Sequence, residues 1–185
     1  TIEKPQAFTL ERAKEFNGKQ FFALYDENML MWFFYNGDFV LDEPVDDFLR
    51  FDGEYIKYEN DDSMYLMDIY GNKILPDDYE YQRIITVNEN LFFVRFKNEK
   101  LSILVDKELN KQSKYRFISN RRKTIPNGGG NMYLVEREDN KFNILLSDGM
   151  FLSPYIWFDE IDGNWNYYCT SPNEKQRVRC TFVRY

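Results

Sequence analysis

The feature that most constrains the fold of this chain is a series of short, aromatic-rich apolar segments separated by tight-turn residues. In most of these turns glycine stands next to asparagine or aspartate, as at residues 36–38, 52–53, 70–72, 148–149 and 162–163. A two-residue hairpin loop needs positive φ angles, which glycine and asparagine adopt most easily. Aromatic residues make up 18% of the chain, and they suit the pleated surface of a strand. The sequence therefore predicts an all-β fold made of hairpins.

Aligning these turns predicts an internal repeat. The segment 32–41 matches 66–75 at an offset of 34 residues, and 100–104 matches 141–145 at an offset of 41. Each unit reads as a hairpin, an irregular stretch and a strand that leads into the next unit. One hairpin cannot bury its apolar face alone and has to stack on its neighbours. We predict a single β-repeat domain over 20–185 with about four diverged units, at 20–60, 61–98, 99–139 and 140–185.

The beginning of the chain predicts a different element. Thr9 can cap a helix, and Gly18 can close it in a left-handed conformation. Phe16 would contribute to an apolar side of this helix. We therefore expect a short N-terminal helical segment within 1–19, packed against the sheet.

The last unit carries a family resemblance. It reads KFNILL at 141–146, DG at 148–149, FLS at 151–153 and WFD at 157–159. This pattern resembles the WG-type β-repeats of bacteria and their phages, in which such a unit recurs roughly every 35 to 45 residues. The resemblance implies a binding or scaffolding role, brings no catalytic residues, and indicates a bacterial or phage source.

The absence of histidine narrows the chemistry open to this chain. It excludes Ser-His-Asp and Cys-His catalysis and histidine metal ligands. Cys169 and Cys180 are too few for a structural zinc site or a disulfide framework, and reduced thiols are favoured over a bridge between them. No apolar run is long enough to span a membrane, and no signal peptide is visible. We predict a cytoplasmic protein that is not an enzyme and uses no metal or cofactor.

Charge is unevenly distributed along this acidic chain, whose net charge is −7. The first 75 residues hold the acidic excess, whereas no acidic residue occurs between Glu108 and Glu136. The basic run 111–123 can contact phosphate or an acidic protein surface, or it can be a solvated loop. Trp157 can form core between units or an exposed aromatic platform. The candidate binding residues are Lys114, Arg116, Arg121, Arg122, Lys123 and Trp157.

These features predict a non-enzymatic protein-binding module of bacterial or phage origin. One alternative is a phage-encoded acidic inhibitor of a host defence nuclease, similar to an anti-CRISPR protein, whose carboxylates imitate a phosphate backbone or occlude the enzyme. Two further alternatives are a small histidine-independent nuclease or glycosidase and a phage virion component. The expected partner is a protein, with a basic or nucleic-acid-binding protein as one option. We expect no membrane partner, and direct nucleic-acid binding only through 111–123.

Overall fold

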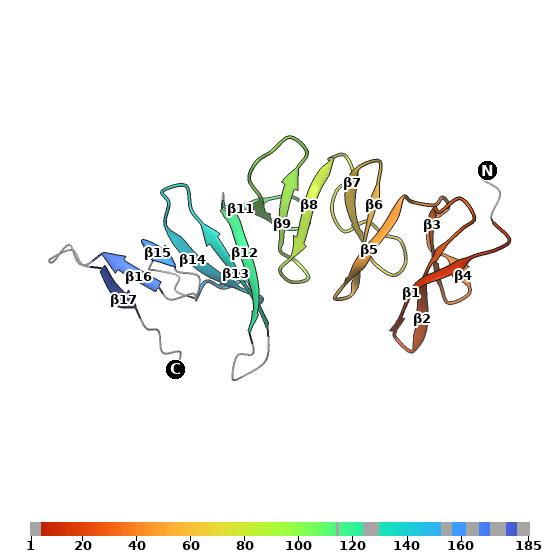
Figure 1. Cartoon of the computed structure of the whole chain (residues 1–185), viewed down its shortest axis with the longest axis horizontal. Coiled ribbons are helices and arrows are strands. Elements are labelled where there is room, and N and C mark those ends of the chain that lie inside the picture. Colours follow the sequence, from red (N-terminus) through yellow and green to blue (C-terminus); the bar gives the residue numbers. More distant parts are fainter. Residues whose placement is uncertain are drawn as a thin grey trace. The chain divides into compact units, whose positions relative to one another are not determined.

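The computed structural model is all-β, which confirms the predicted fold class (Figure 1). It describes residues 5–113, 115–123, 130–152, 157–161, 167–170 and 177–180, and only the backbone at 111–113, 118–123, 130, 161, 167–170 and 177–180. No helix occurs within these described residues. The strands are β1 (Thr9–Phe16), β2 (Lys19–Tyr25), β3 (Met31–Tyr35), β4 (Asp38–Phe39), β5 (Asp47–Asp52), β6 (Tyr55–Asn60), β7 (Ser63–Met67), β8 (Tyr81–Thr86), β9 (Phe92–Phe96), β10 (Ile103–Val105), β11 (Lys111–Ser113), β12 (Arg116–Lys123), β13 (Gly130–Glu136), β14 (Phe142–Leu146), β15 (Glu160–Ile161), β16 (Tyr167–Thr170) and β17 (Arg177–Cys180).

The strands form small antiparallel sheets in which each strand lies beside its neighbours in sequence. The strand orders are β1-β2-β3-β4, β5-β6-β7, β11-β10-β9-β8, β12-β13-β14 and β15-β16-β17. The chain divides into two compact units. Unit 1 comprises the described residues of Thr1–Ile84, Val94–Glu99 and Lys107–Leu109, and unit 2 those of Ile85–Phe93, Lys100–Asp106 and Asn110–Tyr185.

The predicted N-terminal helix is wrong, because its residues form strand β1. Asn17 and Gly18 have φ angles of 50° and 75° and make the two-residue turn that joins β1 to β2. The glycine that could have ended a helix therefore closes a hairpin, as positive φ allows in both settings. Phe16 is the buried residue of β1, and its ring lies 6.1 Å from Phe21 and 5.7 Å from Phe51. This aromatic packing favours the strand.

The strands that begin three of the sheets, β1, β5 and β12, carry a β-bulge at the same position. The register shifts between the second and fourth residues of the strand, which leaves one extra residue opposite the partner strand. The shifts fall between Leu10 and Arg12 in β1, Phe48 and Arg50 in β5, and Phe117 and Ser119 in β12. A bulge bends its strand and increases the local twist. The three sheets thus begin with the same local distortion.

A five-residue turn also recurs, and each copy begins with aspartate. In the turns 26–30, 68–72 and 106–110, the aspartate amide donates to the carbonyl four residues ahead, at 3.0, 3.0 and 3.3 Å. The amide of that fifth residue donates back to the aspartate carboxylate at 2.8–3.0 Å. The fourth residue has positive φ in each copy: Met29, Gly71 and Leu109. Side chain and backbone together therefore fix these turns.

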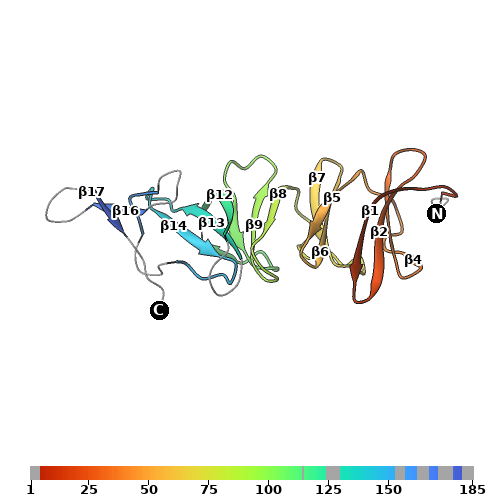
Figure 2. The ribbon, with the colours of Figure 1, turned by 60° about the horizontal axis from the view of Figure 1, so that its bottom comes forward.

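The core of unit 1 is largely aromatic and lies between the sheets β1–β4 and β5–β7, which are side by side in Figures 1 and 2. Phe21 and Phe33 are fully buried, and the Phe33 ring lies 5.8 Å from that of Tyr58. Lys14 of β1 also reaches the second sheet, because its ammonium donates to the carbonyl of Gly53 at 2.6 Å. Unit 2 has its own core, which includes Phe93, Tyr133 and Leu145.

Candidate binding site

The candidate site is built around a buried lysine in unit 1. Lys57 lies in the middle of β6, and its side chain is only 3% exposed. Its Nζ donates to a carboxylate oxygen of Asp52 at 2.8 Å and to the carbonyl oxygen of Ile84 at 2.7 Å. Burial lowers the pKa of Lys57, and the charge and hydrogen bond of Asp52 act in the opposite direction. A cation is thus held beneath the surface by one carboxylate and one carbonyl.

Two arginines lie close to this lysine. Arg50 of β5 is the direct register partner of Lys57, and its guanidinium lies 3.6 Å from the carboxylate of Asp52. Arg83 of β8 immediately precedes Ile84, whose carbonyl Lys57 binds. The positive charges of Arg50 and Arg83 both lower the pKa of Lys57 further. The three cations are therefore near enough to repel one another.

A fourth cation, Arg95 of β9, lies on the strand beside that of Arg83 and completes what we call the arginine cluster: Arg50, Lys57, Arg83 and Arg95. Burial, and then the charges of Arg95 and Arg50, lower the pKa of Arg83. Arg95 is half-buried, and its Nε atom is buried without a hydrogen-bond partner among the described residues. A buried donor without an acceptor is energetically costly.

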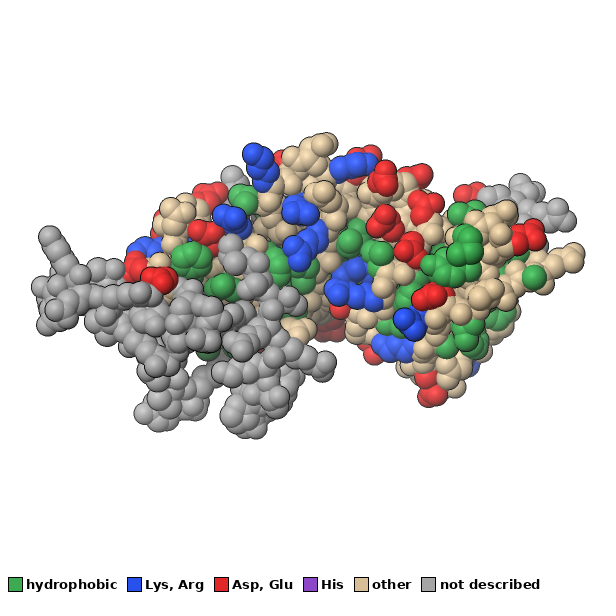
Figure 3. Space-filling model, viewed as in Figure 1, with side chains coloured by type: hydrophobic (Ala, Val, Ile, Leu, Met, Phe, Trp, Pro, Cys, Tyr) green, Lys and Arg blue, Asp and Glu red, His purple; other side chains and the backbone are tan. Residues whose placement is uncertain are grey.

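The arginine cluster is accessible from outside. The Arg50 side chain is 58% exposed, and Arg83 is also exposed. In Figure 3, Lys and Arg side chains gather over β5, β8 and β9, whereas Asp and Glu are frequent elsewhere on the same face. Guanidinium groups bind carboxylates and phosphates through paired N–H donors. The arrangement can therefore hold an anionic group at the surface of an otherwise acidic protein.

Among the basic residues of the predicted run, the structure describes the side chain of Arg116 alone. Arg116 lies at the start of β12 in unit 2, and its guanidinium is 3.3 Å from the carboxylate of Glu136. Lys114 lies outside the described residues. Arg121, Arg122 and Lys123 belong to the backbone of β12, but their side chains lie outside the description. A role for these residues in binding remains a prediction.

Trp157, the remaining predicted residue, lies in an aromatic cluster of unit 2. It is half-buried and packs against the core of this unit. Its ring stacks on Tyr115 at 5.2 Å and lies 5.3 Å from that of Phe151. The guanidinium of Arg137 sits 4.7 Å from the Trp157 ring, at cation–π distance. Packing on the core is thus established for Trp157, and its role in binding remains a prediction.

Sequence reasoning missed the arginine cluster because its members are dispersed. Each comes from a different strand, and Arg50 and Lys57 lie in the half of the chain where acidic residues dominate. The sequence feature that could have identified them is that each cation stands alone, with no other basic residue beside it in its strand. A basic residue inside a strand, among apolar neighbours, is a candidate for burial with a partner. Arg95, between Val94 and Phe96, fits that description.

Within the part of the chain that the structure describes, no group of three or more acidic, cysteine or histidine side chains could hold a metal ion. The described residues also include no helix that could cross a membrane. Comparisons of this chain with protein-family models, curated proteins and solved structures found no match.

Proposed function

We propose that this protein is a non-enzymatic binding module that holds an acidic segment of a partner protein at the arginine cluster. The observation that carries the proposal is that four cations from four strands of unit 1, Arg50, Arg83, Arg95 and Lys57, lie close enough for their like charges to repel. A carboxylate-rich segment would relieve this repulsion and supply acceptors to the guanidinium groups. Because the overall net charge of −7 repels an acidic partner, binding of such a partner would depend on this local concentration of cations.

The scaffold proposed for this role is a tandem repeat. The shared bulge of β1, β5 and β12 and the shared aspartate turns at 26–30, 68–72 and 106–110 support the interpretation of the sheets as diverged copies of one unit. Repeat proteins bind through extended surfaces to which several units contribute side chains. The arginine cluster follows this pattern, because its residues come from β5, β6, β8 and β9.

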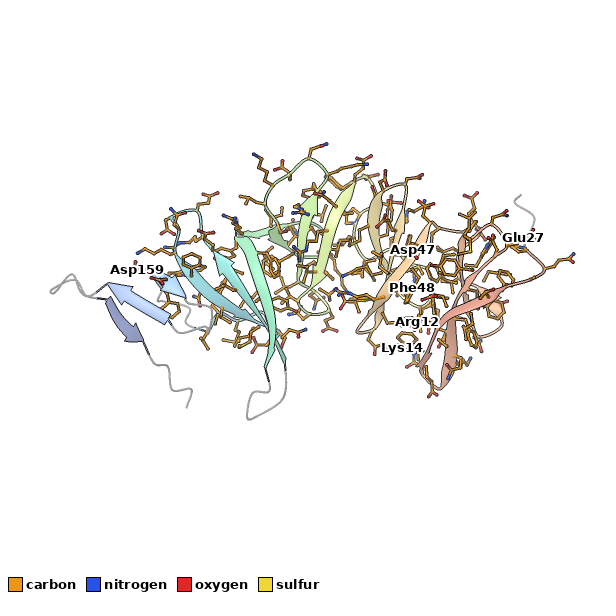
Figure 4. All side chains as sticks on the ribbon, in the orientation of Figure 1. Arg12, Lys14, Glu27, Asp47, Phe48 and Asp159 are labelled. Carbon is orange, nitrogen blue, oxygen red and sulfur yellow. The ribbon has the colours of Figure 1, made fainter. Side chains whose placement is uncertain are left out.

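Replacing Arg83 by glutamate is expected to weaken binding of the partner by about tenfold or more, because the acidic segment then meets a like charge. The matched control is Arg12→Glu, the same charge change at an exposed residue of β1 in the same unit (Figure 4). The measurement is affinity capture from bacterial lysate by wild type and both variants, washed at low and high salt and quantified by mass spectrometry. Circular dichroism establishes that each variant is folded.

The expected result is an acidic partner that wild type and Arg12→Glu retain at low salt, and that Arg83→Glu loses. High salt should release it, because exposed charge pairs are screened. The same acidic partner retained equally by Arg83→Glu would contradict the proposal. A basic partner that Arg83→Glu binds more tightly would favour the acidic inhibitor instead.

A further inference from the structure

A second site lies in unit 1, where three turns meet around a pocket of about 500 Å³. The turn at Asn17 joins β1 to β2, the turn at Asn36 joins β3 to β4, and the third turn, 68–72, contributes Tyr70. Both asparagines are exposed and have positive φ angles of 50° and 54°, as expected for tight hairpin turns. Loops held by a rigid sheet are common positions for binding residues.

The pocket has an aromatic side. Tyr35 is buried, and its hydroxyl donates to the carbonyl of Phe16 at 3.1 Å, which fixes the ring. The ring of Tyr70 lies 6.0 Å from that of Tyr35, with an interplanar angle of 80°. Tyr70 itself is 66% exposed. A large apolar ring surface therefore remains open to solvent at the edge of the pocket.

The position of Tyr70 is fixed by its turn rather than by burial. Its amide donates to the carboxylate of Asp68 at 2.8 Å. The next residue, Gly71, has a φ of 86°, and a Cβ there would lie only 2.6 Å from the carbonyl oxygen of Val40. The turn thus approaches the chain at Val40 too closely for any residue other than glycine. Because this backbone is already fixed, a ligand that stacks on the Tyr70 ring has less chain entropy to remove.

The polar side of the pocket carries groups of mixed chemistry. Asn17 and Asn36 offer amide donors and acceptors, Asp38 offers a carboxylate, and Lys19 offers an ammonium; all four residues are exposed. Because both signs of charge are present, the pocket does not select a strongly charged ligand. Hydroxyl groups, which both donate and accept hydrogen bonds, match this mixture of amide and carboxylate partners.

We propose that this pocket binds a neutral saccharide, with the C–H face of one sugar ring on Tyr70 and its hydroxyls toward Asp38, Asn17 and Asn36. A pyranose ring has both required surfaces, an apolar face and a rim of hydroxyls. The pocket volume of about 500 Å³ lies in the range of small-molecule sites and accommodates one or two sugar rings. The site does not include the arginine cluster, so this inference does not depend on the proposed function.

The test is a titration of the isotope-labelled full chain with glucose, galactose, mannose, N-acetylglucosamine and their β-linked disaccharides, followed by NMR. At least one sugar should shift the signals of the pocket residues and saturate at concentrations on the order of 10 mM or below. Tyr70→Ala should weaken that binding at least about tenfold, since ring contacts carry much of the affinity in such sites. Asp38→Asn should weaken it through the loss of a charged acceptor.

Tyr79→Ala is the matched control, because Tyr79 is another exposed tyrosine of unit 1, at 48%, and does not line the pocket. This variant should bind the sugar as wild type does. The inference would be overturned if no sugar shifted the pocket signals, or if Tyr70→Ala and Asp38→Asn, both folded by NMR, bound with unchanged affinity. Capture of an acidic partner through Arg83 would be unaffected by either result.

Discussion

Replacing Asp52 by alanine is expected to lower the free energy of unfolding by about 3 kcal/mol at neutral pH, because it removes the anion that compensates a buried cation. Lys57 would keep its bond to the Ile84 carbonyl but lose its contact with the carboxylate at 2.8 Å. It would then be left among arginines whose charges already disfavour its protonation. Urea denaturation followed by tryptophan fluorescence measures the change.

The companion variant Lys57→Met separates charge from packing. A buried ion pair contributes little relative to apolar groups of similar size, so Lys57→Met should change stability by no more than about 1 kcal/mol. In the double variant with Asp52→Ala, most of the stability lost in Asp52→Ala should return, because no unpaired cation remains. Equal destabilisation by Asp52→Ala in the presence and absence of Lys57 would contradict this account.

The pH dependence of stability gives an independent check on Lys57. Burial lowers its pKa in the folded protein, so the unfolded chain binds more protons between that lowered value and the ordinary 10.5. The contribution of Lys57 to the free energy of unfolding is therefore complete above pH 10.5 and is lost as the pH falls through the lowered pKa. Relative to Lys57→Met, the wild type should therefore become more stable as the pH rises through this window. The difference removes the background from tyrosines such as Tyr58, whose pKa burial raises to about 12.

Replacing Asp26 by alanine is expected to destabilise unit 1 by about 3 kcal/mol, because three buried or part-buried donors lose their acceptor. The carboxylate accepts hydrogen bonds from the Trp32 indole at 2.9 Å and from the amides of Asn28 and Leu30 at 2.8 and 3.0 Å. Trp32 is 1% exposed, so its indole N–H has no contact with bulk solvent in the folded protein. Burial alone would raise the pKa of Asp26, but these three hydrogen bonds hold it below its ordinary value.

The matched control for Asp26→Ala is Asp106→Ala. This substitution alters the corresponding five-residue turn at 106–110, in which no buried indole among the described residues donates a hydrogen bond to the aspartate. Asp106 accepts from the amide and side chain of Asn110, at 2.8 and 3.0 Å, in an exposed position. Its loss should cost about 1 kcal/mol, the usual value of an exposed side-chain hydrogen bond. Similar losses for Asp26→Ala and Asp106→Ala in thermal or urea denaturation would show that the Trp32 bond contributes little.

The hairpins could be predicted because the signal for each turn lies in the turn itself. Asn36 and Gly37 have φ angles of 54° and 99°, which these residue types adopt with little strain. The N-terminal helix was wrong because Gly18 suits a helix end and a hairpin turn equally well. The deciding contact, between Phe16 and Phe51, joins residues far apart in sequence. Local signals cannot report such packing, which overrides local preference.

The arginine cluster could not be predicted because it depends on how four strands are placed. Lys57 and Arg50 are brought together by the register of β5 and β6, which runs unshifted from the turn after Asp52 as far as Arg50. A turn longer or shorter by one residue would place a different side chain of β5 opposite Lys57. The neighbouring carbonyl of Ile84 comes from another sheet. Composition indicated an acidic surface, and only the fold shows a local concentration of cations within it.

The most direct test of the central claim is a fluorescence anisotropy titration of the full chain with a labelled glutamate-only peptide, with a lysine-only peptide of equal length as control. We predict that wild type and Arg12→Glu bind the glutamate peptide at low salt, that Arg83→Glu binds it at least about tenfold more weakly, and that added salt reduces the wild-type affinity. Binding of the lysine peptide in preference to the glutamate peptide, or equal binding of the glutamate peptide by Arg83→Glu and wild type, would contradict the assignment of the arginine cluster as the partner-binding site.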